Sequence, residues 1–253
     1  MAQAKAELHT LSNANGSATY TSPKSTLTII AGVNYPVEVP YRSDEIPEST
    51  HIEVNVRPNN GVDMVKERHI ESLVTKTLRA VVLGEETPRT MLQVTLQVAS
   101  IESDESLPGG VKGGGQGETY LDLLVGAVNA AVLGCLDAGV QMRSLVGAAL
   151  IGFNEKGDVV VSPRVQERKR CRSLHVFAYT AKGQCVLMES EGRFQVNEWE
   201  AAERTARQIV VDGMDSKNED VDMTGGASAP SVIEMMRKSV EARVAKDKRW
   251  REN

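Results

Sequence analysis

The chain has 253 residues, of which 41% are hydrophobic and 25% are charged, the composition of an ordinary folded globular protein. Its 29 Lys and Arg against 34 Asp and Glu give a formal net charge of −5, which excludes a protein that coats nucleic acid by bulk positive charge. A local basic groove is not excluded, because net charge averages over all faces. The three cysteines have no CxxC spacing, so neither a disulfide scaffold nor a zinc site is expected.

Several other classes of protein are also disfavoured. The most apolar stretch, residues 121–140, is interrupted by Asn129 and Asp137 and predicts a buried helix rather than a membrane span. The first ten residues carry charges and no apolar segment, so we expect no secretory signal and no membrane partner. The four histidines are scattered, and we expect no metal and no cofactor.

The first hundred residues predict strands around one helix. Residues 26–33 form a β-branched apolar run, and Pro36 is expected to end that strand. Residues 52–56 alternate apolar and polar side chains, which is typical of a half-buried strand. Apolar residues at helical spacing predict a helix over 70–82, and residues 89–100 predict the next strand.

A glycine-rich segment and a second helix come next. Residues 102–118 contain six glycines, which predicts a loop. Backbone N–H groups in such a loop could bind phosphate, but the acidic residues at its borders would repel an anion, and a tolerated insertion is the simpler interpretation. The helix predicted over 120–138 has one face of small and apolar residues, expected to pack against a sheet, and Gly139 is placed to end it.

The remaining segments predict a sheet and two further helices. The strands are expected over residues 144–153, 159–161, 175–179 and 185–189. A helix should come after them with Asn197 and Glu200 as its capping pair, ending near Gly213. The predicted fold class is α+β, with helices packed on mixed sheets.

The composition divides the chain into three parts. These are a folded domain over residues 1–213, an acidic disordered linker over 214–229 and a charged C-terminal helix over 230–253. Ile233, Met236, Val240 and Val244 form a narrow apolar stripe on that helix. Two interpretations stay open: the stripe docks on a partner's groove, or the helix is solvated and marginally stable.

Few side chains suggest chemistry. Arg164, Arg168, Lys169, Arg170 and Arg172 form a dense basic cluster that is expected to lie in a loop, either solvated or bound to RNA phosphates or an acidic partner. Cys171 lies among these arginines, which could lower its pKa, although adjacency alone does not establish this. Glu189 and Glu191 share one face of a strand and are expected to be solvated.

Several segments resemble the RNase PH-like ring subunits of the eukaryotic RNA exosome. They are residues 13–18, Tyr35-Pro36, Arg57-Pro58, Pro88-Arg89-Thr90 and the Asp-Ala-Gly segment within residues 136–140. The resemblance covers residues 8–211 and implies an RNase PH-like domain of the ribosomal protein S5 domain 2-like class. It also implies a ring of such subunits with cap proteins, through which single-stranded RNA passes to an associated catalytic nuclease.

The resemblance further implies how an active member would work. Active members are phosphorolytic and bind phosphate with a Gly-Thr/Ser-Arg-Thr segment, whose counterpart here is Gly117-Glu118-Thr119-Tyr120, without the arginine. They place acidic residues after the strand that here ends near Val161, where this chain keeps only Glu167. We therefore expect no catalytic residues, no metal and no enzyme activity.

The resemblance thus predicts a non-catalytic structural subunit that supports ring assembly and threading of RNA for 3′–5′ degradation and processing, including rRNA. It implies localisation in the nucleus and nucleolus, and also in the cytoplasm. The predicted RNA-binding residues are Arg57, Arg89, Arg164, Arg168, Lys169 and Arg170. The alternatives are a phosphorolytic or metal-dependent 3′–5′ exoribonuclease acting as a homodimer, and a nucleotide-binding module that uses the glycine-rich loop.

Overall fold

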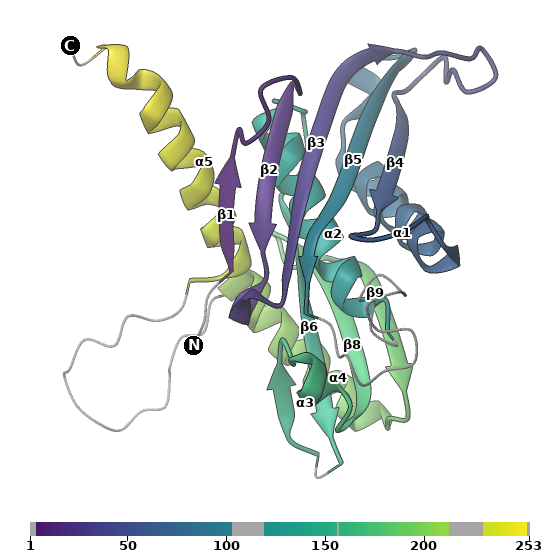
Figure 1. Ribbon diagram of the computed structural model, residues 1–253, viewed down its shortest axis with the longest axis vertical. Helices are drawn as coiled ribbons and strands as arrows, with labels where there is room; N and C mark the ends of the chain where they lie inside the picture. Colours follow the sequence, from purple (N-terminus) through teal and green to yellow (C-terminus); the bar gives the residue numbers. More distant parts are fainter. Residues whose placement is uncertain (1–3, 103–118, 156, 213–229, 252–253) are drawn as a thin grey trace.

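Two β-sheets enclose a central helix in the computed structural model, which describes residues 4–102, 119–155, 157–212 and 230–251 (Figure 1). The first sheet has the strand order β1 (Lys5–Leu8), β2 (Gly16–Thr21), β3 (Leu27–Glu38), β5 (Thr90–Ile101) and β4 (His51–Arg57). Only β4 and β5 run parallel, because α1 (Val65–Val81) and the short turn η2 (Gly84–Glu86) connect them as a crossover. This sheet is therefore mixed, as predicted.

The second sheet is antiparallel throughout. Its order is β7 (Val159–Val161), β6 (Val146–Asn154), β8 (Cys171–Thr180) and β9 (Cys185–Gly192). The one-turn helix α3 (Val165–Arg168) lies between β7 and β8, and α4 (Val196–Arg207) continues into a π-helical turn, η3 (Gln208–Asp212). Helix α5 (Val232–Lys248) and the 3-10 turn η4 (Arg249–Arg251) come after residues 213–229, which lie outside the described part. The linker predicted there stays a prediction.

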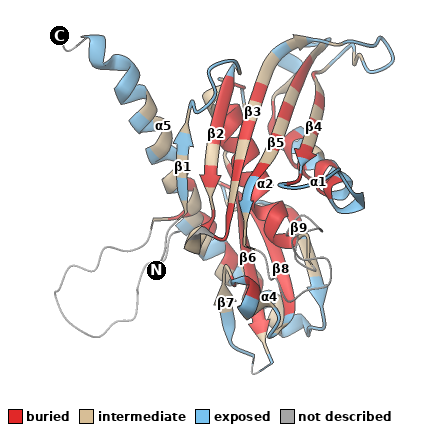
Figure 2. Ribbon diagram, viewed as in Figure 1, coloured by how far each residue is buried: buried red, intermediate tan, exposed pale blue. Residues whose placement is uncertain are grey.

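Helix α2 (Leu121–Asp137) lies between the two sheets and is buried on all sides (Figure 2). The sequence predicted one apolar face; the structure corrects this, because a helix sandwiched between sheets has no solvent-facing side. Its glycines allow close contact with β3: a Cβ atom at Gly126 would lie 2.5 Å from Cδ2 of Leu27, and one at Gly134 would lie 2.8 Å from Cγ2 of Val33. Gly139, with φ of +71°, ends the helix as predicted.

Asn129 in the middle of α2 fixes the helix to both sheets. Its Nδ2 donates to the Tyr20 hydroxyl of β2 at 3.2 Å and to the Ala148 carbonyl of β6 at 3.1 Å. Its Oδ1 accepts the Ala148 N–H at 2.8 Å, so the backbone polar groups of Ala148 that face away from β8 are satisfied. Unpaired buried backbone groups are costly, which explains a polar residue at the centre of an apolar helix.

Several predicted boundaries were wrong, including the start of β8, which lies at Cys171 and not at residue 175. Strand β3 continues through Pro36, because a bulge between Asn34 and Val37 removes the need for a ladder N–H there. Helix α1 begins at Val65, five residues before its apolar spacing becomes visible. Helix α4 begins at Val196 and is capped by Glu198, whose carboxylate accepts the Gln195 N–H at 2.9 Å.

The first half of α5 packs on this chain itself. Ile233 and Met236 are buried in the core, and Ser231 Oγ accepts the Glu234 N–H at the start of the helix. The first two members of the apolar stripe thus dock on their own domain, which neither sequence interpretation foresaw, whereas Val244 is exposed. None of the helices in the described residues combines the length and apolar character that crossing a membrane requires.

Candidate anion pocket at the start of α2

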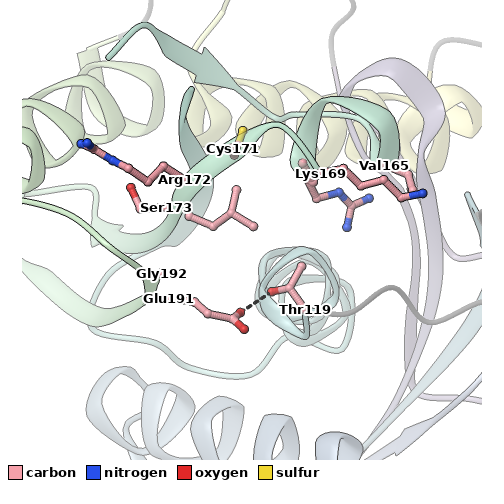
Figure 3. Close-up of a pocket in the computed structure, with 10 residues that line it drawn as sticks. Thr119, Val165, Lys169, Cys171, Arg172, Ser173, Glu191 and Gly192 are labelled. Atoms are coloured by element: carbon pink, nitrogen blue, oxygen red, sulfur yellow. Dashed lines mark hydrogen bonds between the residues drawn. The ribbon is translucent and has the colours of Figure 1, made fainter. Parts of the chain in front are cut away.

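A pocket of about 180 Å³ lies where the start of α2 meets α3, β8 and β9 (Figure 3). Its wall includes Thr119, Lys169, Arg172, Ser173 and Glu191. The start of a helix presents unpaired N–H groups and the positive end of the helix dipole, so an anion would normally be stabilised here. Thr119 and the wall residues within 168–174 belong to the two segments that resemble the phosphorolytic site, whereas the glycine-rich segment 103–118 lies outside the described residues.

The chain's own groups already occupy the start of α2. Thr119 Oγ1 accepts the Leu121 N–H at 3.1 Å and donates to the Glu191 carboxylate at 2.7 Å, the contact drawn across the pocket in Figure 3. The Tyr120 hydroxyl donates to Glu189 at 3.2 Å. These two carboxylates lie beside the start of α2, and their negative charge disfavours an anion there.

Arg168 is the basic residue most deeply placed beside the pocket, and its charge is already paired. Its side chain is 8% exposed, and Nη2 lies 3.0 Å from Oδ2 of Asp122 in the first turn of α2. The contact is an ion pair without hydrogen-bond alignment, since Nη2 and Nε of Arg168 have no hydrogen-bond partner among the described residues. Burial raises the pKa of the Asp122 carboxyl, and the guanidinium opposes that shift.

Glu167, the acidic residue retained from the expected acid/base segment, is held as a carboxylate. It accepts the Arg164 N–H at 2.8 Å and a hydrogen bond from Lys24 Nζ at 2.9 Å. The backbone hydrogen bond from Arg164 and the contact with Lys24 lower its pKa. A general acid needs a proton near neutral pH, so these contacts make Glu167 a poor one.

The neighbouring Arg172 and Cys171 are also unsuited to chemistry. The Arg172 guanidinium is directed away from Thr119 and forms a salt bridge with Glu198 of α4 (Figure 3). Burial raises the pKa of the Cys171 thiol, and Glu167 adds to the shift. The lowered pKa considered from sequence was therefore wrong, because burial outweighs the nearby arginines.

The predicted RNA-binding residues do not form one surface. Arg57 ends β4 opposite Gln97 of β5, whereas Arg89 precedes β5 with φ of +62°. Eight residues of strand separate the two positions, roughly 25 Å at the rise of a β-strand. Both are exposed, and Nε of Arg89 lies 3.5 Å from Oε1 of Glu45.

The basic segment forms a third location, and it is not the loop that was predicted. Arg164, Lys169 and Arg170 are exposed on and beside α3. Arg168 must be removed from the predicted RNA-binding set, because its buried guanidinium pairs with Asp122. Among the described residues, no group of three His, Cys, Asp or Glu side chains comes together as a metal site would require.

The sequence did not predict the role of the acidic residues at the start of α2. Glu189 and Glu191 were expected to be solvated, but they bind the two residues before α2 from 69 and 72 positions away. Asp122 was not considered at all. The available signal was an acidic residue in the first turn of a predicted helix, which is common at helix starts and points to no particular partner.

The fold places this chain in a class of α+β proteins with two sheets around one buried helix. Residues 3–141 match domain 1 of the 3′ exoribonuclease family, RNase PH, and the chain belongs to that family. Most of the elements that contribute to the pocket, α3, β8 and β9, lie beyond the matched region.

Curated relatives include exosome components of fungi. The Saccharomyces cerevisiae exosome complex component RRP46 is 27% identical over 75% of this chain and 82% of its own length. The Schizosaccharomyces pombe component rrp46 is 31% identical over 53% of this chain and 50% of its own length. A rice relative, 28% identical over 64% of this chain and 60% of its own length, is named exosome complex exonuclease RRP46 homolog.

Solved structures share the fold. Rice Rrp46 superposes with a TM-score of 0.67 at 22% identity, covering 83% of this chain and 89% of the rice chain. A chain of the Archaeoglobus fulgidus exosome with RNA bound to the active site gives a TM-score of 0.63 at 14% identity, covering 82% of this chain and 85% of the other. These likenesses confirm the predicted RNase PH-like α+β fold.

Proposed function

We propose that this chain is a non-catalytic structural subunit of an RNA exosome ring. In this role it supports assembly with other RNase PH-like subunits and cap proteins, and passage of single-stranded RNA to an associated nuclease for 3′–5′ degradation and processing, including that of rRNA. The RRP46 names of its curated relatives support the ring assignment. We place it in the nucleus and nucleolus, and also in the cytoplasm.

One observation carries the non-catalytic part of the proposal: carboxylates of this chain already bind Thr119 and Arg168 at the start of α2, where the family resemblance puts the phosphate site. Glu191 holds Thr119 at the start of α2, and Asp122 neutralises Arg168. Phosphorolysis needs a bound phosphate, and the carboxylates around this helix start disfavour one. It also needs an acid for the leaving group, and Glu167 is held ionised by Lys24 and Arg164.

The proposed RNA contacts are the exposed residues of the predicted set. Arg57, Arg89, Arg164, Lys169 and Arg170 can each neutralise a phosphate, which needs only correctly placed positive charge. Their separation supports contacts with an extended strand in a shared path rather than one high-affinity site. Each single replacement by Ala should weaken RNA binding uniformly across sequences and lower the salt slope by about 0.7 per lost contact.

Affinity purification followed by native mass measurement tests the assembly part. The tagged full-length chain should recover a hetero-oligomer of many different subunits. A stable homodimer as the main species would instead favour the exoribonuclease alternative, which the name of the rice relative keeps in view. A matched variant with Lys76, which is exposed on α1, replaced by Ala serves as the purification control.

A further inference from the structure

The end of α5 forms a charged surface that the proposed ring function does not use. Residues 237–251 contain seven Lys and Arg against two acidic residues, a formal net charge of +5 in a chain whose total is −5. The family match ends at residue 141, so this helix lies outside it. Its distal turns extend beyond β1, away from both sheets (Figure 1), and residues 244–250 are exposed (Figure 2).

Specific contacts hold the base of this helix to the domain. Ile233 and Met236 are buried, and Nε of Arg243 lies 3.8 Å from Oδ1 of Asp137 at the end of α2. Asp137 is itself fixed, because it accepts the Ser17 N–H at 2.8 Å. The helix is thus anchored as far as Arg243, and its last turns project from a rigid base.

The projecting turns carry charge that the fold leaves uncompensated. Lys246, Lys248 and Arg249 are exposed, and none of them forms an ion pair with a described residue. Asp247 is turned to Arg243 instead, in a salt bridge. Because a solvated Lys or Arg side chain readily contacts a polyanion, these three residues offer phosphate contacts at little cost in desolvation.

Trp250 distinguishes between possible polyanions. Its side chain is 72% exposed, and it lies between Arg249 and Arg251 in the sequence. An exposed indole ring provides a surface on which an unpaired base stacks, an interaction that an acidic protein surface does not supply. A large exposed aromatic side chain among several cations is therefore typical of a surface that binds single-stranded nucleic acid.

We propose that the distal α5 surface, formed by Lys246, Lys248, Arg249 and Trp250, binds single-stranded RNA outside the ring's shared path. The basic residues contact phosphates, and Trp250 stacks on a base. The choice of RNA among polyanions rests on the proposed function, whereas the surface itself does not. The rigid base of α5 would hold a bound strand at a fixed place beside β1.

Fluorescence anisotropy with the full-length chain and a labelled single-stranded RNA tests this inference. The K246A/K248A/R249A variant should bind more weakly, and its slope of log K against log salt should be smaller by about 2 for three lost contacts. The W250A variant should lose about fivefold or more in affinity, with little change in slope. The matched control R42A/K76A/K182A removes the same charge at scattered exposed positions and should bind as the unmodified chain does.

The competing occupant, an acidic protein surface, gives a different result. Polyglutamate of equal charge should compete at least about tenfold less well than RNA if stacking contributes. Competition by polyglutamate as strong as that by RNA would overturn the inference. So would an unchanged RNA affinity of the W250A variant, or an RNA affinity of the control variant as low as that of the triple variant. If the α5 variants bind RNA as the unmodified chain does and the chain still assembles into a ring, only this inference is overturned. If the α5 variants bind RNA more weakly as expected and the chain does not assemble into a ring, only the proposed function is overturned.

Discussion

Two basic segments of this chain look alike in sequence, but the fold pairs different shares of their charges. Residues 164–172 contain five basic residues in nine positions, and residues 237–251 contain seven in fifteen. In the first, Arg168 and Arg172 are paired with Asp122 and Glu198, which come from distant helices. In the second, the last turns project into solvent. The density of basic residues therefore does not locate a binding surface. What decides is whether the fold places acidic side chains beside the basic ones and pairs their charges.

The largest expected effect comes from unpairing the buried charge of the first segment. The Asp122→Ala variant leaves the Arg168 guanidinium buried without its partner, which should lower the free energy of unfolding by about 3–5 kcal/mol. Urea denaturation measures the change. The double variant D122L/R168M removes both charges and should recover most of the loss. A cost below about 1 kcal/mol for Asp122→Ala would show that water reaches Arg168.

Asp137 tests the anchor of the second segment. The Asp137→Ala variant leaves the Ser17 N–H without an acceptor and releases Arg243, at an expected cost of about 1–3 kcal/mol. Hydrogen exchange in α5 should then be faster than in the unmodified chain, and this increase should exceed any increase in α2. Unchanged protection of α5 would mean that Ile233 and Met236 alone hold the helix.

His175, on β8 three residues beyond the first segment, extends the comparison to protonation. Its nitrogens contact the hydroxyls of Ser190 at 2.8 Å and Ser173 at 3.1 Å, and burial lowers its pKa below 6.5. As the pH falls, the unfolded chain therefore protonates at His175 before the folded chain does. The contribution of His175 to the free energy of unfolding is fully present above pH 6.5 and is lost as the pH falls through the lowered pKa of the folded chain. A His175→Gln variant should flatten this slope in denaturation midpoints between pH 8 and 5; an identical slope would assign it to other groups.

The smallest effect is expected at the distal end of α5. Removing three charges in the K246A/K248A/R249A variant should change the free energy of unfolding by no more than about 0.5 kcal/mol, because these side chains are exposed and form no ion pair with a described residue. Equal denaturation midpoints for the variant and the unmodified chain would confirm the contrast with Asp122→Ala. A loss of about 2 kcal/mol or more, on the order of a buried contact, would contradict it.

Local patterns predicted the fold well because each element carries its own periodicity. Helix α2 and strand β5 were placed within a residue of their bounds from apolar spacing and a terminal glycine. The start of α1 was missed, since its first turn, with Val65 exposed, lies beyond the buried stripe. The end of β3 was wrongly predicted at Pro36, because the bulge that accommodates this proline depends on pairing with β5. Such pairing cannot be predicted from the local sequence.

The site was predicted only in part, for a related reason. The loss of the phosphate-binding arginine and the paired acids was inferred from a segment-by-segment resemblance. The partners of Arg168, Arg172 and Thr119 are 46, 26 and 72 positions away in the sequence. Such pairs form only when the chain is folded, so exposure of a basic residue could not be judged from its neighbours.

The proposed loss of phosphorolysis is tested most directly by product analysis. The purified full-length chain is incubated with end-labelled single-stranded RNA in buffer alone, with inorganic phosphate and with Mg²⁺. If the carboxylates at the start of α2 exclude phosphate, the RNA stays intact and no nucleoside diphosphates form under any of the three conditions. Phosphate-dependent release of nucleoside diphosphates by the chain alone would contradict a non-catalytic subunit.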